Sequence, residues 1–396
     1  MVRVGFTFEM TGAWIGGANY FRSLIAAVLA LPDRNIEPVI FAAQDDAEGL
    51  SAQFPGVTIV PTRLFTRRAV PWLGRKLALR ATGRDPLLHH LLREHGVDVL
   101  SHSGCLGPGA TIPAIGWIAD LQHRRLPALC SARESAARDA TINRWRRYCA
   151  ALVFSSHAAR ADFARFYGEA AIPAYVIPFV PLTHPVPPVA ATEALASYAL
   201  PPAYFYVPNQ FWVHKNHGIV IEAARRLGKA GLAVELVFTG GTQDYRDGGH
   251  YAGLVALAAE LGDHARFLGV VPYADVLALM EGALAVINPS RFEGWSTTVE
   301  EARNLGKSIL LSDIDVHREQ APPRAVYFNP DDADDLAVRM RTAWTSMDDS
   351  LEQALRRQHT PDVPAMRRAF GAAFEHAVLE VHAAHVAAAN PARAIR

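Results

Sequence analysis

Short apolar runs alternate with helix-period segments along most of the 396-residue chain. In the first half, segments 18–31 and 85–96 have helical spacing, and the apolar runs between them are rich in β-branched and aromatic residues. Unbroken apolar runs are typical of parallel strands covered on both faces, so the alternation predicts βαβ units. The strands predicted here are 2–8, 37–43, 57–60, 97–103, 114–120, 151–156 and 174–180.

A change in amino-acid composition divides the chain. Residues 182–203 are rich in proline and alanine and have no strand pattern, which predicts an inter-domain linker. The alternation then restarts, with helical segments at 218–231 and 297–306, and one long helical pattern begins at about Pro364. Two doubly wound, Rossmann-like α/β domains should therefore meet at a cleft, with ligands beyond the carboxyl ends of the strands. The strands predicted in the second half are 204–210, 233–240, 265–271, 282–290, 307–313 and 325–330.

Composition excludes several classes of protein. Thirty-nine basic and thirty-nine acidic residues give a formal net charge of zero, so overall charge does not indicate nucleic acid as a partner. The three cysteines have neither metal-type spacing nor a disulfide pattern, which favours the cytoplasm. The chain opens on the strand-like VRVGFTF, so we expect no signal peptide, and no apolar run approaches the roughly 20 residues that span a bilayer.

Candidate chemistry gathers in RFEGWSTTVEEARNLGK (291–307), which follows an apolar strand. Glu293 lies in the loop, and Glu301 lies eight positions later, about one turn into the predicted helix. Thr297 and Glu300 have the spacing of a capping box, which places the helix start near Thr297. The two acids therefore bracket a helix N-terminus, where outward-pointing amides favour phosphate and carboxylates accept hydrogen bonds from vicinal hydroxyls. A plain acidic first turn is the competing interpretation.

This segment resembles the signature of the retaining glycosyltransferases of family four, also called group 1, which have the two-domain GT-B fold. Further resemblances follow in order: PNQFWVHKNHGIVIEAARRL (208–227), RFLGVVPYADVLALMEGA (266–283), LLSDIDVHREQ and AVYFNPDDADDLA. They cover the second half densely and the first half thinly. The resemblance implies a GT-B arrangement of an N-terminal acceptor-side domain (1–181), the linker, a nucleotide-sugar-binding domain (204–362) and a C-terminal helix (363–396) packing back towards the first domain.

Roles follow from the resemblance. It implies that Glu301 binds the donor ribose, Glu293 the transferred sugar and Lys215 the diphosphate, as a compact ammonium suited to shared phosphate charge. Val270 lies in the segment that resembles the base-binding one. The amides facing the sugar and the diphosphate would be those of Gly294, Trp295, Ser296, Thr297 and Thr298.

The first domain contributes further expectations and departures. Gly16 and Gly17 open a helix, as the glycine-rich first loop of the family does. Asp120, in WIADLQHRRLP, follows an alanine where the family often has histidine, so His123 is the candidate sugar contact, with a polar loop histidine as the alternative.

Two features of this sequence differ from the family's pattern or resemble a metal motif, and both concern the charge of the site. Gln210 stands where the family often has a phosphate-binding arginine, so charge must come from another residue, with His214 as one candidate. The D-x-D of Asp313 and Asp315 resembles a metal motif of other folds, but it lies in a segment for which the family implies no metal. We expect no metal and no cofactor, with the nucleotide-sugar as a substrate.

The implied reaction is retaining transfer of a hexose from a GDP- or UDP-linked donor, with GDP-mannose favoured, in cell-surface polysaccharide synthesis. An oxocarbenium-like transition state and a departing phosphate that takes the acceptor proton require no general base.

Residues 63–84 contain seven basic residues and no acid, with Trp72 and leucines interleaved. This segment predicts either contact with the inner face of an anionic membrane and a lipid-linked acceptor, or an ordinary solvated surface. A sugar-nucleotide epimerase of the same fold and a non-catalytic nucleotide-binding relative are the alternative functions.

Overall fold

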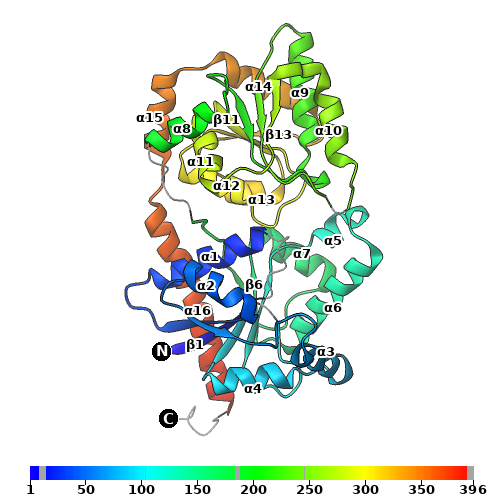
Figure 1. Ribbon diagram of the computed structural model, residues 1–396, viewed down its shortest axis with the longest axis vertical. Coiled ribbons are helices and arrows are strands. Elements are labelled where there is room, and N and C mark those ends of the chain that lie inside the picture. The colour runs from blue at the N-terminus through cyan, green and yellow to red at the C-terminus, as the bar shows by residue number, and fades with distance from the viewer. Residues whose placement is uncertain (9–14, 103, 183–187, 245, 390–396) are drawn as a thin grey trace. The chain divides into compact units, whose positions relative to one another are not determined.

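The computed structural model describes residues 1–8, 15–102, 104–182, 188–244 and 246–389, and it divides into two compact units (Figure 1). Within the described residues, unit 1 comprises Met1–Arg124, Ser131–Leu182 and the chain from Val363 onward. Unit 2 comprises Arg125–Cys130 and the chain from Thr183 to Asp362. Each unit is built around one parallel sheet.

The sheet of unit 1 has the order β3-β2-β1-β4-β5-β6-β7, and all its neighbouring strands are parallel. The order runs outward from β1 in both directions, which makes it doubly wound. Its strands are β1 (Val2–Phe8), β2 (Ile36–Ala42), β3 (Thr58–Pro61), β4 (Val99–His102), β5 (Ala114–Ile118), β6 (Ala151–Phe154) and β7 (Ala174–Val176).

Helices connect these strands, and the last helix of the chain joins them. The C-terminal helix α16, red in Figure 1, belongs to unit 1 and packs on α1. The two backbones approach closely at Gly371, where a Cβ atom would lie 2.5 Å from the carbonyl oxygen of Ala27. The helices of unit 1 are α1 (Ile15–Leu29), α2 (Ala47–Gln53), α3 (Val70–Thr82), α4 (Pro86–Glu94), α5 (Gln122–Arg125, whose last residue belongs to unit 2), α6 (Ala132–Tyr148), α7 (His157–Tyr167) and α16 (Val363–Ala389).

The sheet of unit 2 has the order β10-β9-β8-β11-β12-β13 and is also parallel throughout. From β8 the chain moves outward to β9 and β10 and then crosses to β11 on the other side of β8. The boundary between β8 and β11 is therefore the topological switch point, where open α/β sheets bind ligands. The strands are β8 (Phe205–Val207), β9 (Leu236–Phe238), β10 (Ala265–Phe267), β11 (Ala285–Asn288), β12 (Ile309–Ser312) and β13 (Ala325–Phe328).

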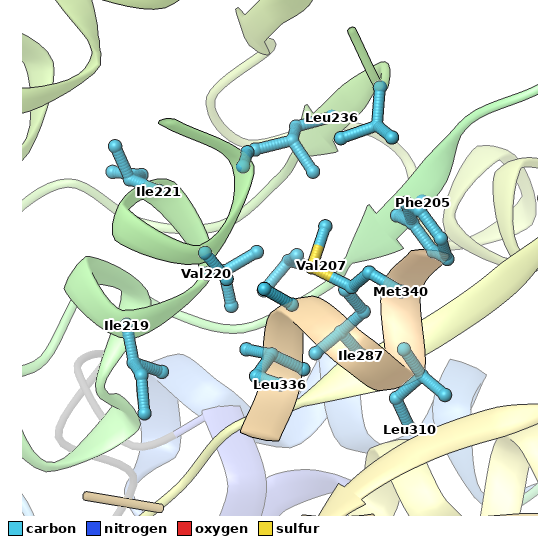
Figure 2. Packing of buried hydrophobic residues seen from close by; sticks show 14 of the residues in the cluster. Phe205, Val207, Ile219, Val220, Ile221, Leu236, Ile287, Leu310, Leu336 and Met340 are labelled. Carbon is cyan, nitrogen blue, oxygen red and sulfur yellow. The ribbon is translucent and has the colours of Figure 1, made fainter. Parts of the chain in front are cut away.

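Helices cover both faces of this second sheet, and alternate residues of each strand enter different cores. In β8, Phe205 packs in the cluster formed with α9 and α14 (Figure 2). Tyr206 packs in the cluster formed with α11 and α12. Both are fully buried, which explains why β8, with the sequence FYV, has no residue suited to a solvent-exposed face. The helices are α8 (Pro188–Ser197), α9 (His217–Lys229), α10 (His250–Ala258), α11 (Tyr273–Gly282), α12 (Thr297–Asn304), α13 (Asp315–Gln320), α14 (Ala333–Thr345) and α15 (Asp349–His359).

The segment predicted as a linker contains helix α8, which packs on α11 in unit 2. Leu195 contacts the apolar cluster beside α11, and the Tyr198 hydroxyl donates to an Asp275 carboxylate oxygen at 2.6 Å. This proline- and alanine-rich segment therefore contains a packed helix, which its alanines favour because alanine has the highest helix propensity. Residues 183–187 of the predicted linker lie outside the described residues.

The predicted fold class, two doubly wound parallel-sheet domains with a returning C-terminal helix, is confirmed. Every predicted strand is present, but most are shorter than their apolar runs. Among the described residues, no helix combines the length and the apolar character needed to cross a membrane.

The close approach of α16 to α1 gives a test of this packing. Gly371→Ala should lower the free energy of unfolding of unit 1 by about 1–3 kcal/mol, because the added methyl group meets main-chain atoms that must move apart. Gly49→Ala, in α2 of the same unit, is the control, because no atom lies within 4 Å of its Cβ position. Calorimetric unfolding checks both, and an equal response of the two variants would contradict the tight packing.

Candidate active site

Loops at the switch point of unit 2 carry most of the predicted site residues. Strands β8, β11 and β12 are neighbours and run in parallel, so their carboxyl ends lie at one edge of the sheet. Lys215 lies in the loop after β8, and Glu293 lies in the loop after β11. Residues 78 positions apart in sequence are thus placed side by side by sheet topology.

An ion pair joins these two loops. Lys215 Nζ lies 2.6 Å from Glu293 Oε1, and their side chains are only 15% and 10% exposed. The Ser290 hydroxyl donates to the same carboxylate oxygen at 2.7 Å. Burial opposes ionisation of Glu293, but the Lys215 ammonium overcomes it and holds the pKa of this carboxyl below its usual value. The structure therefore contains a charged pair, where the sequence suggested two separate contacts.

Asn216 fixes the position of Lys215. Lys215 ends the short 3₁₀ turn η3 (Val213–Lys215), and Asn216 follows with a left-handed φ of 57°, a conformation that asparagine tolerates better than most residues. Its Nδ2 donates to the carbonyl oxygens of Pro289 at 3.2 Å and Pro330 at 2.8 Å. One side chain thereby holds the loop after β8 to the loops after β11 and β13.

Three buried histidines surround the pair without adding charge. Burial, together with nearby cations, lowers the pKa of His214 to about 3, and burial lowers that of His217 to about 3 and that of His317 to about 4. Each imidazole is therefore neutral near pH 7. His214 cannot supply the positive charge that the sequence left unassigned.

Glu301 lies within α12 and is 5% exposed. The hydroxyl of Tyr273, the first residue of α11, donates to Glu301 Oε1 at 2.7 Å. Burial raises the pKa of this carboxyl to about 7, although the hydrogen bond from Tyr273 favours the ionised form. Sequence reasoning missed Tyr273, which lies in the segment that resembles the base-binding one.

The N-terminus of α12 differs from the prediction. The helix begins at Thr297 as expected, but Ser296 is the N-cap residue, and no side chain caps the helix. The predicted capping box is wrong, because Glu300 accepts hydrogen bonds from Arg303 and Gln320, both at 2.8 Å. Gln320 also bonds the main chain of Ser296 twice: its Nε2 donates to the Ser296 carbonyl oxygen at 3.0 Å, and its Oε1 accepts from the Ser296 N–H at 3.2 Å. It therefore joins α13 to the start of α12.

The remaining predicted donor residues in unit 2 occupy varied environments. Thr298 is buried, and its hydroxyl donates to Asn209 Oδ1 at 3.2 Å. Gln210 is partly buried in the loop after β8. Val270 is 75% exposed in the loop after β10. The other partly buried residues of the loop and first turn are Gly294, Trp295 and Thr297.

The predicted residues of unit 1 belong to separate local networks. His123 is buried in α5, where its Nε2 lies 3.1 Å from Asp139 Oδ1 and 3.0 Å from the Tyr167 hydroxyl oxygen. Asp120 follows β5 and accepts from the main-chain N–H of Gln122 at 2.9 Å. The two predicted glycines, Gly16 and Gly17, lie in the first turn of α1.

The D-x-D pair occupies an ordinary surface position. Both carboxylate oxygens of Asp313 accept from Arg318 at 2.6 Å, and Asp315 is the first residue of α13. Within the described part of the chain, no group of three or more His, Cys, Asp or Glu side chains is arranged to hold a metal ion.

Comparison with known proteins finds a family that is similar to this domain. Residues 194–358 match the family model described as glycosyl transferases group 1. The O-antigen chain mannosyltransferase RfbU of Salmonella typhimurium is 27% identical over 150 residues, which are 38% of each chain. This chain therefore spans little more than a third of that curated relative. The predicted resemblance to group 1 glycosyltransferases is confirmed for the second half of the chain.

Solved structures extend the likeness to the whole fold. Anabaena HepE, in complex with UDP and glucose, has a TM-score of 0.67 at 15% identity, covering 96% of this chain and 99% of that one. Sucrose-phosphate synthase from Thermosynechococcus elongatus has a TM-score of 0.65 at 15% identity, covering 98% and 100%. The lipopolysaccharide outer core galactosyltransferase WaaB has a TM-score of 0.60 at 16% identity, covering 96% and 99%. At these identities the likeness shows the fold, which is GT-B.

The Lys215–Glu293 pair should stabilise unit 2 only as a pair. Lys215→Met or Glu293→Gln alone should each cost about 3–5 kcal/mol, because a buried group loses its partner. The double variant should cost clearly less than the sum of the two. Calorimetric unfolding of the four proteins gives the coupling energy.

A surface pair in the same unit provides the control. Arg226 and Asp334 lie 2.7 Å apart, but their side chains are 38% and 79% exposed. The cycle of Arg226→Gln and Asp334→Asn should give a coupling energy much smaller than that of the Lys215–Glu293 cycle, because solvent screens exposed charges. Similar coupling in both cycles would contradict the special character of the Lys215–Glu293 pair.

Proposed function

We propose that this protein is a glycosyltransferase that moves a hexose from a nucleoside-diphosphate sugar to a glycan or lipid-linked acceptor. The observation that carries the proposal is the placement of Lys215, Glu293 and Glu301 around one edge of the sheet, within the region that matches the group 1 family. The names of the relatives favour a sugar nucleotide: RfbU is a mannosyltransferase, and the HepE structure contains UDP and glucose. A GDP- or UDP-linked hexose is the proposed donor, with GDP-mannose favoured, in cell-surface polysaccharide synthesis.

Each charged residue receives a role. Glu301 accepts hydrogen bonds from the ribose hydroxyls, and Glu293 accepts them from the transferred sugar. Lys215 and the N-terminal amides of α12 face the diphosphate, whose negative charge grows as the sugar–phosphate bond breaks. Because Glu293 already holds Lys215 at 2.6 Å, the ammonium is oriented before the donor arrives.

The proposed chemistry is retaining and independent of metal and cofactor. The sugar ring becomes oxocarbenium-like, and the acceptor attacks the face from which the diphosphate leaves. The departing phosphate oxygen takes the acceptor proton, so no side chain serves as general base. In unit 1, the proposed sugar contact is His123, whose Nε2 is bonded to Asp139 and Tyr167.

The test begins with donor binding. Thermal-shift screening against UDP-, GDP- and dTDP-sugars should raise the melting temperature for one donor class, because a ligand of the folded state stabilises it. With that donor and an oligosaccharide or polyprenyl-phosphate acceptor, transfer should retain the anomeric configuration and continue in EDTA. Formation of the epimeric sugar without an acceptor would instead indicate the epimerase, and binding without any turnover would indicate the non-catalytic relative.

Donor binding should depend on pH through Glu301. The ribose hydroxyls bind the ionised carboxylate, and its pKa in the free protein is raised to about 7. As the pH falls below 7, binding must first remove a proton, so affinity should fall towards tenfold per pH unit; above 7 it should level off. Calorimetric titration of the nucleoside diphosphate from pH 5 to 9 measures this profile.

Tyr273 supplies a sharper version of this test. Tyr273→Phe removes a hydrogen bond that favours the charged carboxylate, so the midpoint of the pH profile should move upward. Tyr198→Phe is the control, because its hydroxyl bonds Asp275 instead. A profile that is flat in the parent, or unchanged by Tyr273→Phe, would remove Glu301 from the ribose site.

For the acceptor side, we propose contact with an anionic membrane on the cytoplasmic face. Helix α3 exposes Val70, Leu73 and Leu77 by 80%, 52% and 69%, and their spacing places them on one helical face. Arg67 and Arg68, just before the helix, are exposed. Apolar insertion together with positive charge at the surface suits a bilayer rich in acidic lipids.

One basic residue of this segment is directed inward. Arg75 is buried, its Nε lies 2.6 Å from Asp85 Oδ2, and its guanidinium carbon lies 4.7 Å from the centroid of the Phe65 ring. The sequence placed Arg75 on the basic surface, and this was wrong, because the paired acid lies one residue beyond the acid-free stretch 63–84. A membrane test must therefore leave Arg75 unchanged.

The protein should sediment with phosphatidylglycerol vesicles in low salt and dissociate as salt rises, because charges are screened beyond about 8 Å at physiological ionic strength. Leu73→Asn with Leu77→Asn, or Arg67→Glu with Arg68→Glu, should each abolish sedimentation and leave donor binding intact. Val338→Asn with Leu351→Asn is the apolar control, because these residues are 57% and 53% exposed on unit 2. Equal sedimentation of the α3 variants and the parent would make α3 an ordinary surface.

A further inference from the structure

A second cation, Arg246, lies beside the loop that carries Lys215. Arg246 follows β9, the parallel neighbour of β8, so both loops leave the same edge of the sheet. Its side chain is 9% exposed, and that of its partner Asp244 is 2% exposed. Arginine is rarely so buried in a surface loop, and burying the charge costs free energy unless it has partners. The position therefore requires an explanation.

Asp244 holds Arg246 against the Lys215 loop. Asp244 Oδ1 accepts from the main-chain N–H of Arg246 at 3.0 Å and from its Nε at 3.2 Å. Asp244 Oδ2 accepts from the main-chain N–H of Val213, the first residue of the turn that ends at Lys215, at 3.2 Å. One carboxylate thus fixes both the plane of the guanidinium and the turn that positions the ammonium.

Ring contacts and main-chain contacts complete the attachment. The guanidinium carbon of Arg246 lies 5.3 Å from the centroid of the Trp212 ring. The main-chain N–H of Phe211 donates to the carbonyl oxygen of Gly241 at 3.0 Å. A Cβ atom on Gly240 would lie 2.3 Å from the carbonyl oxygen of Asn209, so the two loops touch where they leave the sheet. Arg246 is held in place before any ligand arrives.

The Trp212 ring contacts both the guanidinium of Arg246 and the ring of His214, the residue before Lys215. His214 is 4% exposed, its ring centroid lies 5.6 Å from that of Trp212, and its Nδ1 is buried without a hydrogen-bond partner. Burial is the main cause that lowers the pKa of this imidazole; the charges of Lys215 and Arg246 lower it further, whereas those of Glu293 and Asp244 raise it. Because the neutral ring adds no charge, the cations here are the lysine and the arginine, each held by a carboxylate.

We propose that Arg246 is a second phosphate-binding residue, which acts with Lys215 on the diphosphate of the donor. The inference rests on the proposed function and specifies its phosphate site. Lys215 is paired with Glu293 and Arg246 with Asp244, and Gln210 on the Lys215 loop is uncharged, so a diphosphate with at least two negative charges would engage both cations rather than Lys215 alone. A planar guanidinium can bind phosphate oxygens through two parallel hydrogen bonds, which an ammonium cannot do.

The proposal separates binding of the phosphates from binding of the nucleoside. Calorimetric titration with UDP, GDP, uridine and guanosine is run on the parent and on Arg246→Gln and Arg246→Lys. Arg246→Gln should weaken binding of the preferred nucleoside diphosphate about 10- to 100-fold, the range expected for lost hydrogen bonds to a charged group. Binding of the matching nucleoside should change less than about twofold. Arg246→Lys should recover part of the lost affinity, because it restores charge without the planar geometry.

Arg291→Gln is the matched control. Arg291 lies on the loop after β11 at the same edge of the sheet and, like Arg246, is paired with an aspartate, Asp331 at 3.0 Å, but its side chain is 46% exposed. This variant should leave binding of the diphosphate within about twofold of the parent. An equal loss in Arg246→Gln and Arg291→Gln would indicate a general charge effect and overturn the assignment.

Other outcomes are equally informative. Unchanged diphosphate binding in Arg246→Gln overturns the inference and leaves the proposed function standing. Equal loss of nucleoside and diphosphate binding means that Arg246 only supports the loop, which also overturns it. If the parent binds neither UDP nor GDP, the proposed function fails, and the inference fails with it.

Discussion

The contact between the Lys215 ammonium and the Glu293 carboxylate is the constraint on which the candidate site depends. Both groups are almost fully removed from water, so each is costly to bury without the other. The pair forms only if β8 and β11 are adjacent and parallel, because each residue lies just beyond the carboxyl end of its strand. The order of the strands in the sheet therefore determines whether the two charges of the site can pair.

The loops around this contact are fixed to one another by buried polar side chains. Asn216 holds the Lys215 turn to the loops after β11 and β13, and Gln320 holds α13 to the start of α12. Asp244 fastens the loop after β9 to the same turn. Such bonds hold the charged groups in place before a ligand binds, and a preorganised site stabilises developing charge without reorganising during the reaction. A rigid sheet edge can thus orient a donor through loop residues alone.

Sequence patterns predicted the fold well because both sheets are buried on both faces. Strand ends were less predictable: the run 174–180 stays apolar after β7 ends at Val176, since Ile177 and Phe179 are buried without extending the strand. Apolarity reports burial, whereas the strand boundary depends on a hydrogen-bonded neighbour. Helix α8 was missed because its proline- and alanine-rich composition looks like a linker until Leu195 is seen against α11.

The residues of the candidate site also divide into those that the sequence could predict and those that it could not. Glu293, Glu301 and Lys215 could be selected because the segments that carry them resemble motifs of the group 1 glycosyltransferases; their spacing alone left a plain acidic first turn as the competing interpretation. Tyr273 and Arg246 could not, because each acts through a contact between loops that are distant in sequence. Inward-facing Arg75 illustrates the same limit, since a basic stretch does not reveal which of its charges finds a buried acid. Spacing within one segment can be measured from the sequence, whereas a contact between two distant segments can be known only from the fold.

The most direct measurement is a crystal structure with the preferred nucleoside diphosphate bound. We expect the ribose hydroxyls within hydrogen-bond distance of the Glu301 carboxylate and the diphosphate between the N-terminus of α12 and Lys215. A nucleotide bound elsewhere, or one that leaves Glu301 and Lys215 without contact to it, would contradict the assignment of this sheet edge as the donor site.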